Sequence, residues 1–195
     1  MKYPGINRTF KDKTALKENH SKRGMSLEKD INTSNKYYLN NDIAVIYKKP
    51  TPIKLVKVSY PKRSKAKICD ARFKERSTTD YNGIYKGKYI DFEAKECHSK
   101  TSFPYTSIHK HQIEHLKKVE KHGALSFLII KMCFYGEVYL IKSKDFINYY
   151  NNNVRKSLPY EWIKNNGFII NGKYTNPCDY IKSLELAFKK ELENE

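Results

Sequence analysis

The chain has 195 residues, which suits one domain with a core of ordinary size and one sizeable extension. Its 38 Lys and Arg outweigh 21 Asp and Glu and give a formal net charge of +17, so a polyanion is the expected partner. No run approaches the roughly 18 apolar residues of a membrane span, and the first residues lack the apolar stretch of a signal peptide. The chain is therefore expected to be cytoplasmic, with nucleic acid as the first candidate partner and a membrane surface as the alternative.

The basic charge is concentrated towards the N-terminus. Residues 1–76 hold 20 of the basic residues but only seven of the acids. Residues 1–22 have few apolar side chains and no periodicity, which predicts a flexible basic arm. Residues 23–195 are expected to form a single domain.

A helix and a strand are expected directly after this arm. Ser26 is a plausible N-cap, and Leu27 and Ile31 fall near one face of a helix that runs to about residue 39. The run Ile43–Lys49 is short and β-branched, which predicts a buried strand.

Residues 53–75 are expected to form a long β-hairpin with a basic tip. Apolar residues partly alternate on each side of Pro61–Ser64, and residues 54–76 hold nine basic groups against two acids. One interpretation is a solvated hairpin, and the other is a protruding finger that meets phosphates, which the overall charge favours. The candidate DNA contacts on this finger are Lys62, Arg63, Lys65, Lys67, Arg72 and Lys74.

The rest of the chain reads as alternating strands and helices around a mixed sheet. The expected strands are Asn82–Tyr85 and Lys88–Glu96, joined across Lys86 and Gly87, then a strand buried on both faces at Leu125–Met132 and its neighbour Tyr135–Ile141. The expected helices are His109–Lys121 with Gly123 as C-cap, one that Ser143 caps and that ends near Asn151–Asn153, and two in the tail at Pro159–Asn165 and Cys178–Leu192.

The four cysteines, Cys69, Cys97, Cys133 and Cys178, are scattered along the chain without a CxxC pair. A zinc cluster or a disulfide framework would need closer, patterned spacing. The expectation is therefore four reduced, partly buried thiols.

The strongest chemical signal lies in the strand expected at Lys88–Glu96. Because side chains alternate along a strand, Asp91, Glu93 and Lys95 share one face. Three charges on a strand between core strands carry a desolvation cost, and such charges usually meet a metal or a substrate.

Asp80 completes this pattern, because the tight hairpin after it can fold it back beside Glu93. Two adjacent carboxylates repel each other unless a cation lies between them, and oxygen ligands suit Mg²⁺ or Mn²⁺. Lys95 is then placed to contact the attacking water or the phosphorus centre of a scissile phosphate. The D…ExK pattern is weak alone, and a solvated strand with an ion pair is its alternative. Strand placement, the hairpin and the basic charge favour a nuclease acting on DNA.

Several nearby residues are further candidates. Glu28, on the helix before the first strand, points either to the same end of the sheet or to solvent. Gln112 either reaches a metal through its amide oxygen or a water, or lies at the surface. His111 and His115 have i, i+4 spacing but lack the HExxH carboxylate, so solvated helix histidines, or occasional phosphate contacts, are favoured over zinc ligands for them and for His109.

The longer motifs resemble the RecU family of Holliday-junction resolvases. The resemblance runs from about Arg23 to Ile141, with a weaker echo near Asp179–Ile181, and the region Lys142–Asn176 departs from it. The segments that carry it are Arg23–Glu28, Asp42–Pro52, Tyr60–Ala66, Ser77–Glu96 and His111–His115.

This resemblance implies an α/β, restriction-endonuclease-like fold: a mixed central sheet flanked by helices, with the hairpin as a stalk that projects into a junction. It implies a Mg²⁺-dependent homodimer that nicks two symmetric strands of four-way junction DNA in recombination and repair, with Mn²⁺ as a possible substitute. By motif, Thr78, Asp80, Glu93 and Gln112 match metal-binding positions and Lys95 matches the transition-state stabiliser. A recombinase and a branch-migration helicase are candidate protein partners.

Two other functions stay open from the sequence. One is a restriction-like or repair endonuclease that cuts ordinary duplex DNA with the same site. The other is a protein that binds junctions or regulates a recombinase without cutting. The number of metals, any sequence preference at the cut and the dimer interface cannot be read from the residues.

Overall fold

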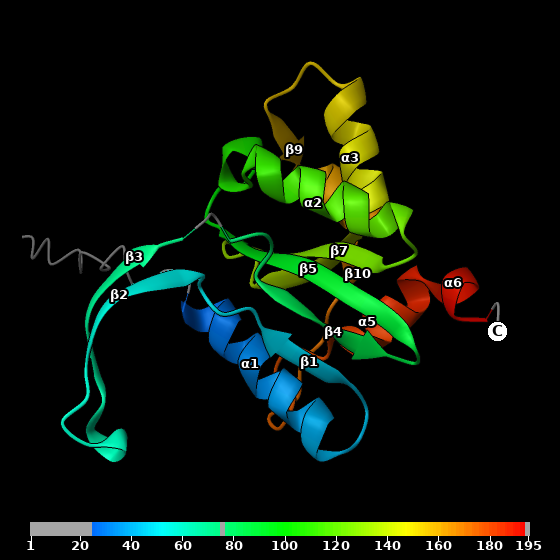
Figure 1. Ribbon diagram of the computed structural model, residues 1–195. Coiled ribbons are helices and arrows are strands. Elements are labelled where there is room, and N and C mark those ends of the chain that lie inside the picture. Colours follow the sequence, from blue (N-terminus) through cyan, green and yellow to red (C-terminus); the bar gives the residue numbers. More distant parts are fainter. Residues whose placement is uncertain (1–24, 75–76, 194–195) are drawn as a thin grey trace, which may run out of the picture.

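The computed structural model describes residues 25–74 and 77–193, so the predicted arm at residues 1–22 lies outside the described residues (Figure 1). A six-stranded mixed sheet with the order β1-β4-β5-β7-β8-β10 forms its centre. The strands of this sheet are β1 (Val45–Lys48), β4 (Tyr81–Tyr85), β5 (Lys88–Cys97), β7 (Leu125–Met132), β8 (Glu137–Lys142) and β10 (Phe168–Ile169).

Strand β5 lies inside the sheet, antiparallel to β4 and parallel to β7. Helices cover both faces of the sheet (Figure 1). They are α1 (Met25–Asn40), α2 (Lys110–Lys121), α3 (Ser143–Asn152), α4 (Tyr160–Asn166), α5 (Tyr180–Ala187) and α6 (Lys189–Glu193). This arrangement confirms the predicted α/β class with a mixed sheet flanked by helices, as expected for a restriction-endonuclease-like fold.

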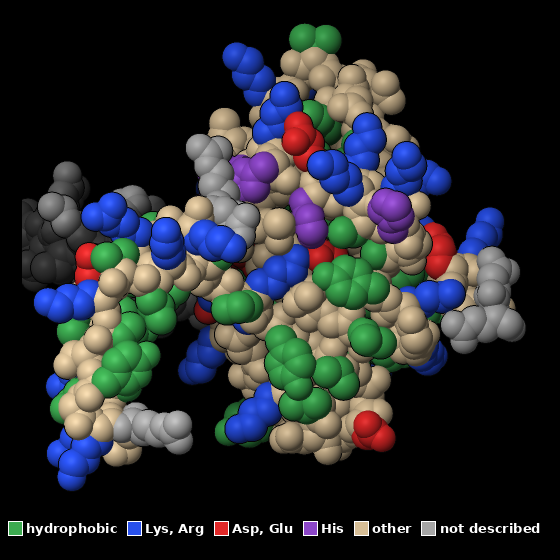
Figure 2. All heavy atoms as spheres, in the orientation of Figure 1, with side chains coloured by type: hydrophobic (Ala, Val, Ile, Leu, Met, Phe, Trp, Pro, Cys, Tyr) green, Lys and Arg blue, Asp and Glu red, His purple; other side chains and the backbone are tan. Residues whose placement is uncertain are grey.

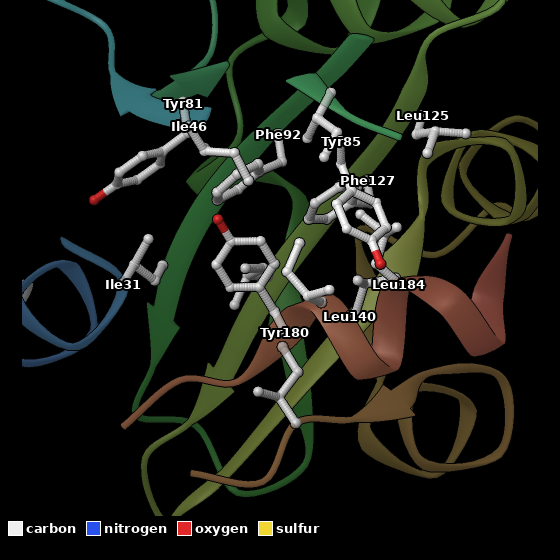
Figure 3. Close-up of a cluster of buried hydrophobic side chains, with 14 of the residues drawn as sticks. Ile31, Ile46, Tyr81, Tyr85, Phe92, Leu125, Phe127, Leu140, Tyr180 and Leu184 are labelled. Carbon is white, nitrogen blue, oxygen red and sulfur yellow. The ribbon is translucent and has the colours of Figure 1, made fainter. Parts of the chain in front are cut away.

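An aromatic column holds the sheet to the helices on the α1 and α5 side. The rings of Tyr81, Phe92 and Phe127, from three adjacent strands, stack with centroids 4.8 and 4.7 Å apart (Figure 3). Tyr180 of α5 packs on Phe92 at 5.3 Å and is fully buried. Phe92 alternates with the charged residues of β5, so this packing fixes the strand that presents them on its other face.

A second core lies between the opposite face of the sheet and helices α2, α3 and α4. It joins Leu128 and Ile130 of β7 to Leu116, Phe146 and Ile163 of these helices. Two short strands that the sequence patterns did not predict, β6 (Ser102–Pro104) and β9 (Ser157–Pro159), pair antiparallel beside it. Strand β10 was also missed, because two residues are too few to show periodicity.

The predicted hairpin is a separate two-stranded sheet that projects from the body (Figure 1). It consists of β2 (Ile53–Ser59) and β3 (Lys67–Phe73), with a short 3-10 turn at Arg63–Lys65. Nearly all of its described side chains are exposed. The protruding hairpin expected from the charge pattern is therefore confirmed.

Four sequence predictions were wrong in detail. The strand expected to be buried at Ile43–Lys49 is the edge strand β1, and its outer face leaves Val45 and Tyr47 exposed. Helix α1 begins at Met25, before the predicted cap Ser26. Helix α3 begins at Ser143 itself, with Lys142 at the N-cap and no side-chain cap bond. The last predicted helix divides into α5 and α6, because the backbone leaves helical geometry at Phe188.

The α-helices of the described residues are between 5 and 16 residues long. None of them is both long and apolar enough to cross a bilayer.

Gly83 provides a test of the packing between β1 and β4. A Cβ atom at this position would lie 2.2 Å from the carbonyl oxygen of Val45 and 2.6 Å from the Cα atom of Ile46. Because both are backbone atoms, Gly83→Ala should lower the free energy of unfolding by about 1–3 kcal/mol. Urea denaturation measures this change. Gly136→Asn, in an open left-handed turn that Asn tolerates, is the control, and an equal effect in both variants would contradict the close approach.

Candidate active site

The β4–β5 hairpin places the predicted acid pair side by side. Its two turn residues, Lys86 and Gly87, have positive φ angles of 46° and 69°, as a tight two-residue turn requires. The register pairs Tyr81 with Phe92, so Asp80 comes opposite Glu93 at the next position. The Asp80 carboxylate accepts a 3.3 Å hydrogen bond from the backbone N–H of Ala94 in β5.

Lys95 lies between the two carboxylates. Its ammonium group forms a close ion pair with Oε1 of Glu93 and lies 3.7 Å from Oδ2 of Asp80. The Glu93 side chain is fully buried, whereas the Asp80 and Lys95 side chains are 34% and 28% exposed. The three predicted catalytic residues therefore meet at one place that opens to solvent on the Asp80 side.

Burial and neighbouring charges shift the pKa values of Glu93 and Lys95. Loss of hydration raises the pKa of Glu93 to about 7, and the neighbouring Asp80 charge adds to the rise while Lys95 opposes it. Burial lowers the pKa of Lys95, but the charges of Glu93 and Asp80 outweigh it and the net shift is upward. The ammonium group is therefore held in its charged form beside the acids.

The residues present fit a divalent cation. Oε2 of Glu93 is buried and has no hydrogen-bond partner among the described residues. A buried carboxylate oxygen left unpaired is costly, and a cation would satisfy it. Together with the partly exposed Asp80, this oxygen offers the hard ligands that Mg²⁺ and Mn²⁺ prefer.

Gln112 is buried against the acid pair, so the surface alternative for it was wrong. Its Nε2 donates a 2.7 Å hydrogen bond to Oε1 of Glu93. Its Oε1, the atom expected to reach a metal, accepts a hydrogen bond from the backbone N–H of His109 and so caps α2. In this arrangement Gln112 orients Glu93 through its amide nitrogen.

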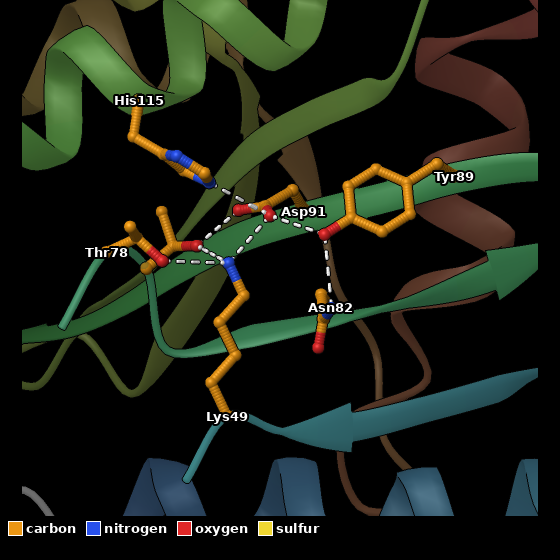
Figure 4. A network of polar contacts seen from close by, with 7 residues as sticks. Lys49, Thr78, Asn82, Tyr89, Asp91 and His115 are labelled. Carbon is orange, nitrogen blue, oxygen red and sulfur yellow. Dashed lines mark hydrogen bonds and ion pairs between the residues drawn. The ribbon is translucent and has the colours of Figure 1, made fainter. Parts of the chain in front are cut away.

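Thr78 lies close to a second polar cluster on the same face of β5, which is centred on Asp91 (Figure 4). Asp91 is fully buried, and its carboxylate is bonded to four side chains: Lys49, Thr79, Tyr89 and His115. Sequence reasoning placed Asp91 on the correct face but did not identify the cluster. The missing signal was Lys49, which no periodicity connects to the strand.

His111, His115 and Glu28 have definite partners. The ring of His115 contacts Asp91 at 3.1 Å, and that of His111 contacts the backbone carbonyl of Ser77 at 3.0 Å, so neither is the purely solvated histidine expected. Glu28 pairs with Lys48 at 2.6 Å on the exposed side of α1. The structure thus does not bring Glu28 into the acid pair.

The predicted DNA contacts belong to the hairpin, and Lys and Arg side chains gather along it in Figure 2. The side chains of Lys62, Lys65, Lys67, Arg72 and Lys74 are exposed, and Arg63 lies in the turn at the tip. At the hairpin base, a pocket of about 780 Å³ is bounded by Phe73 and Lys74 on one side and by His109, His111 and Gln112 on the other. The pocket connects the basic hairpin to the start of α2, where Gln112 contacts Glu93.

Another group of possible metal ligands lies at the end of β5. One ligand atom from each of Glu96, His98 and Cys133 falls within 4.8 Å of the others. However, Glu96 already accepts the backbone N–H of Leu27 at 2.8 Å and lies 3.7 Å from the ammonium group of Lys131. This group is separate from the predicted acid pair. The described cysteines are free thiols, two of them buried and Cys69 exposed.

Comparisons with known proteins give a consistent family match. The family model "Recombination protein U" (RecU) matches residues 22–186. The chain is 47% identical over 180 residues to a Holliday junction resolvase RecU of Bacillus cytotoxicus and 48% identical to those of Bacillus cereus and Bacillus anthracis. Each alignment covers 90% of this chain and 90% of the relative.

The raised pKa of Glu93 predicts how stability depends on pH. Between the ordinary value of 4.5 and about 7, the folded chain keeps a proton that the unfolded chain has lost, so stability falls as pH rises through this window. The slope from this group approaches about 1.4 kcal/mol per pH unit. Glu93→Gln should remove this contribution to the pH dependence. Urea unfolding of the wild type and of Glu93→Gln should therefore show a difference in free energy of unfolding that changes with pH. A constant difference across the window would contradict the shift.

Proposed function

The chain belongs to the RecU family, and on that premise we propose that it is a Holliday junction resolvase: an endonuclease that makes symmetric nicks in four-way DNA junctions during recombination and repair. The chemistry rests on one observation: the buried Oε2 of Glu93, beside Asp80 and Lys95, has no hydrogen-bond partner among the described residues. We further propose that residues 23–195 form a single nuclease domain.

Mg²⁺, with Mn²⁺ as a substitute, is the proposed cofactor. Glu93 and Asp80 would hold it, with Thr78 and Gln112 as further ligands either directly or through water. Gln112 would need to turn its amide to present oxygen, because its Nε2 now faces Glu93. When bound, the ion would lower the pKa of a water molecule and neutralise charge on the scissile phosphate.

Lys95 supplies a second positive charge at the same place. The two carboxylates keep its ammonium group protonated and fix it close to where a phosphate would meet the acids. Charge that develops on the phosphate oxygens in the transition state would be stabilised by this preorganised donor.

The hairpin is the proposed junction-binding element. Its exposed lysines and arginine meet phosphates, and such contacts position a protein without carrying sequence information. Preference for a junction would therefore come mainly from shape. Two symmetric nicks require two active sites, so we propose a cytoplasmic homodimer that works with a recombinase and a branch-migration helicase.

Removal of either acid should separate cutting from binding. Asp80→Asn and Glu93→Gln should each reduce cleavage of a synthetic four-way junction in Mg²⁺ to below about one hundredth of the wild-type rate, since the metal loses a charged ligand. Junction binding, measured by gel shift in EDTA, should survive because phosphate contacts lie elsewhere. A linear duplex of the same sequence is the control substrate. Equal cutting of duplex and junction by the wild type would contradict the resolvase assignment, and retained cutting by either variant would falsify the acid site.

The salt dependence of junction binding tests the hairpin. Lys62→Gln, Lys65→Gln and Lys67→Gln combined should flatten the plot of log K against log salt by about 0.9 for each phosphate that the variant no longer neutralises. The matched control neutralises three exposed lysines of the C-terminal helices, Lys182, Lys189 and Lys190. A slope that changes equally in both triple variants would show that the hairpin has no special role.

A further inference from the structure

Lys49 contacts the segment Thr78–Asp80, which leads into the acid pair. We propose that Lys49, which directly follows β1, is a positioning residue that fixes this segment, and with it the Asp80 carboxylate, against β5. This role rests on the proposed function, since it concerns how the metal site of that reaction is assembled.

Lys49 holds three consecutive residues at once. Its backbone N–H donates to the carbonyl oxygen of Asp80 at 2.8 Å. Its ammonium group donates to the hydroxyl oxygens of Thr79 at 2.6 Å and Thr78 at 3.2 Å (Figure 4). One residue thus binds the segment through both main chain and side chain.

Asp91 holds both Lys49 and Thr79 in place. Its fully buried carboxylate pairs with the Lys49 ammonium group at 2.7 Å, and its second oxygen accepts from the Thr79 hydroxyl. Tyr89 and His115 contact the first oxygen as well, both at 3.1 Å. Asp91 is therefore saturated by protein groups, in contrast to Glu93, whose Oε2 has no partner in the part of the chain that the structure describes. The difference makes Asp91 a structural anchor and leaves Glu93 for a cation.

Asp80 depends on these contacts because its own side chain has only long contacts with the described residues. Its carboxylate has a 3.3 Å hydrogen bond and a 3.7 Å ion-pair contact, both long. It also precedes the first residue of β4, where the regular strand pairing begins. A site whose ligand must be ordered at the moment of binding loses affinity to that entropy cost, so a fixed segment favours the metal.

The sign of the change in metal affinity separates positioning from simple electrostatics. Removing the positive charge of Lys49 should, by loss of Coulomb repulsion alone, tighten binding of a divalent cation at Asp80 and Glu93. Removing a positioning residue should weaken it. The direction of the change in metal affinity therefore decides between a positioning role and a purely electrostatic effect.

The experiment measures Mn²⁺ affinity of the DNA-free protein by titration calorimetry, with junction cleavage followed in parallel. Lys49→Met should weaken Mn²⁺ binding at least about fivefold, and a high Mn²⁺ concentration should restore much of the cleavage rate. Lys49→Arg, which keeps a donor cation, should recover part of the affinity. Lys86→Met is the matched control. It removes the exposed ion pair with Glu185 at the turn of the β4–β5 hairpin and should leave the Mn²⁺ affinity unchanged.

Lys49→Met leaves Asp91 buried without its cation, which destabilises a fold strongly. Lys49→Met combined with Asp91→Asn removes both charges and keeps the folded state accessible, and the positioning role predicts the same weakening there. Unchanged or tighter Mn²⁺ binding in the folded double variant would overturn that role, even if the wild type cuts junctions and Asp80→Asn does not. Conversely, weakened binding in a protein whose wild type never cuts junctions would support the role and refute the proposed function.

Discussion

Charged side chains in the middle of a sheet are the constraint around which this molecule is organised. Strand β5 lies between β4 and β7, and it carries Asp91 and Glu93 with no exposed surface. Each buried charge loses hydration worth several kcal/mol unless other groups replace the water. The two acids meet this demand differently. Asp91 is bonded to four side chains of the protein. Glu93 is bonded to Lys95 and Gln112, and its other oxygen has no partner within residues 25–74 and 77–193.

The opposite face of β5 makes that arrangement rigid. Phe92 sits in a stack of rings that reaches from β4 to β7 and is covered by α5, so the strand has little freedom to move its charged side chains. A hydrated strand could let Glu93 turn towards water and keep an ordinary pKa. Packing on one face thus sustains the perturbed ionisation on the other, as a preorganised site requires.

Local patterns predicted what depends on local geometry. The β4–β5 hairpin, its turn at Lys86 and Gly87 and the meeting of Asp80 with Glu93 all follow from alternation and turn chemistry within about 20 residues. The patterns failed where the deciding contact is distant. Strand β1 was expected to be buried because its composition is apolar, but only the strand order of the whole sheet places it at an edge. The partnership of Lys49 with Asp91 spans 42 positions and links elements that no period relates.

The chain connectivity also links the basic hairpin to the acid pair. The basic hairpin ends at Phe73, and four residues of the following segment, Ser77 to Asp80, lead directly into the acid site. Within that segment His111 contacts the Ser77 carbonyl and Lys49 contacts the next two side chains, so the segment is held both from α2 and from the residue that follows β1. A displacement of the hairpin by a bound polyanion would have to pass through these contacts before it could move Asp80. The same hydrogen bonds that position the Thr78–Asp80 segment therefore separate a displacement of the hairpin from the acid pair.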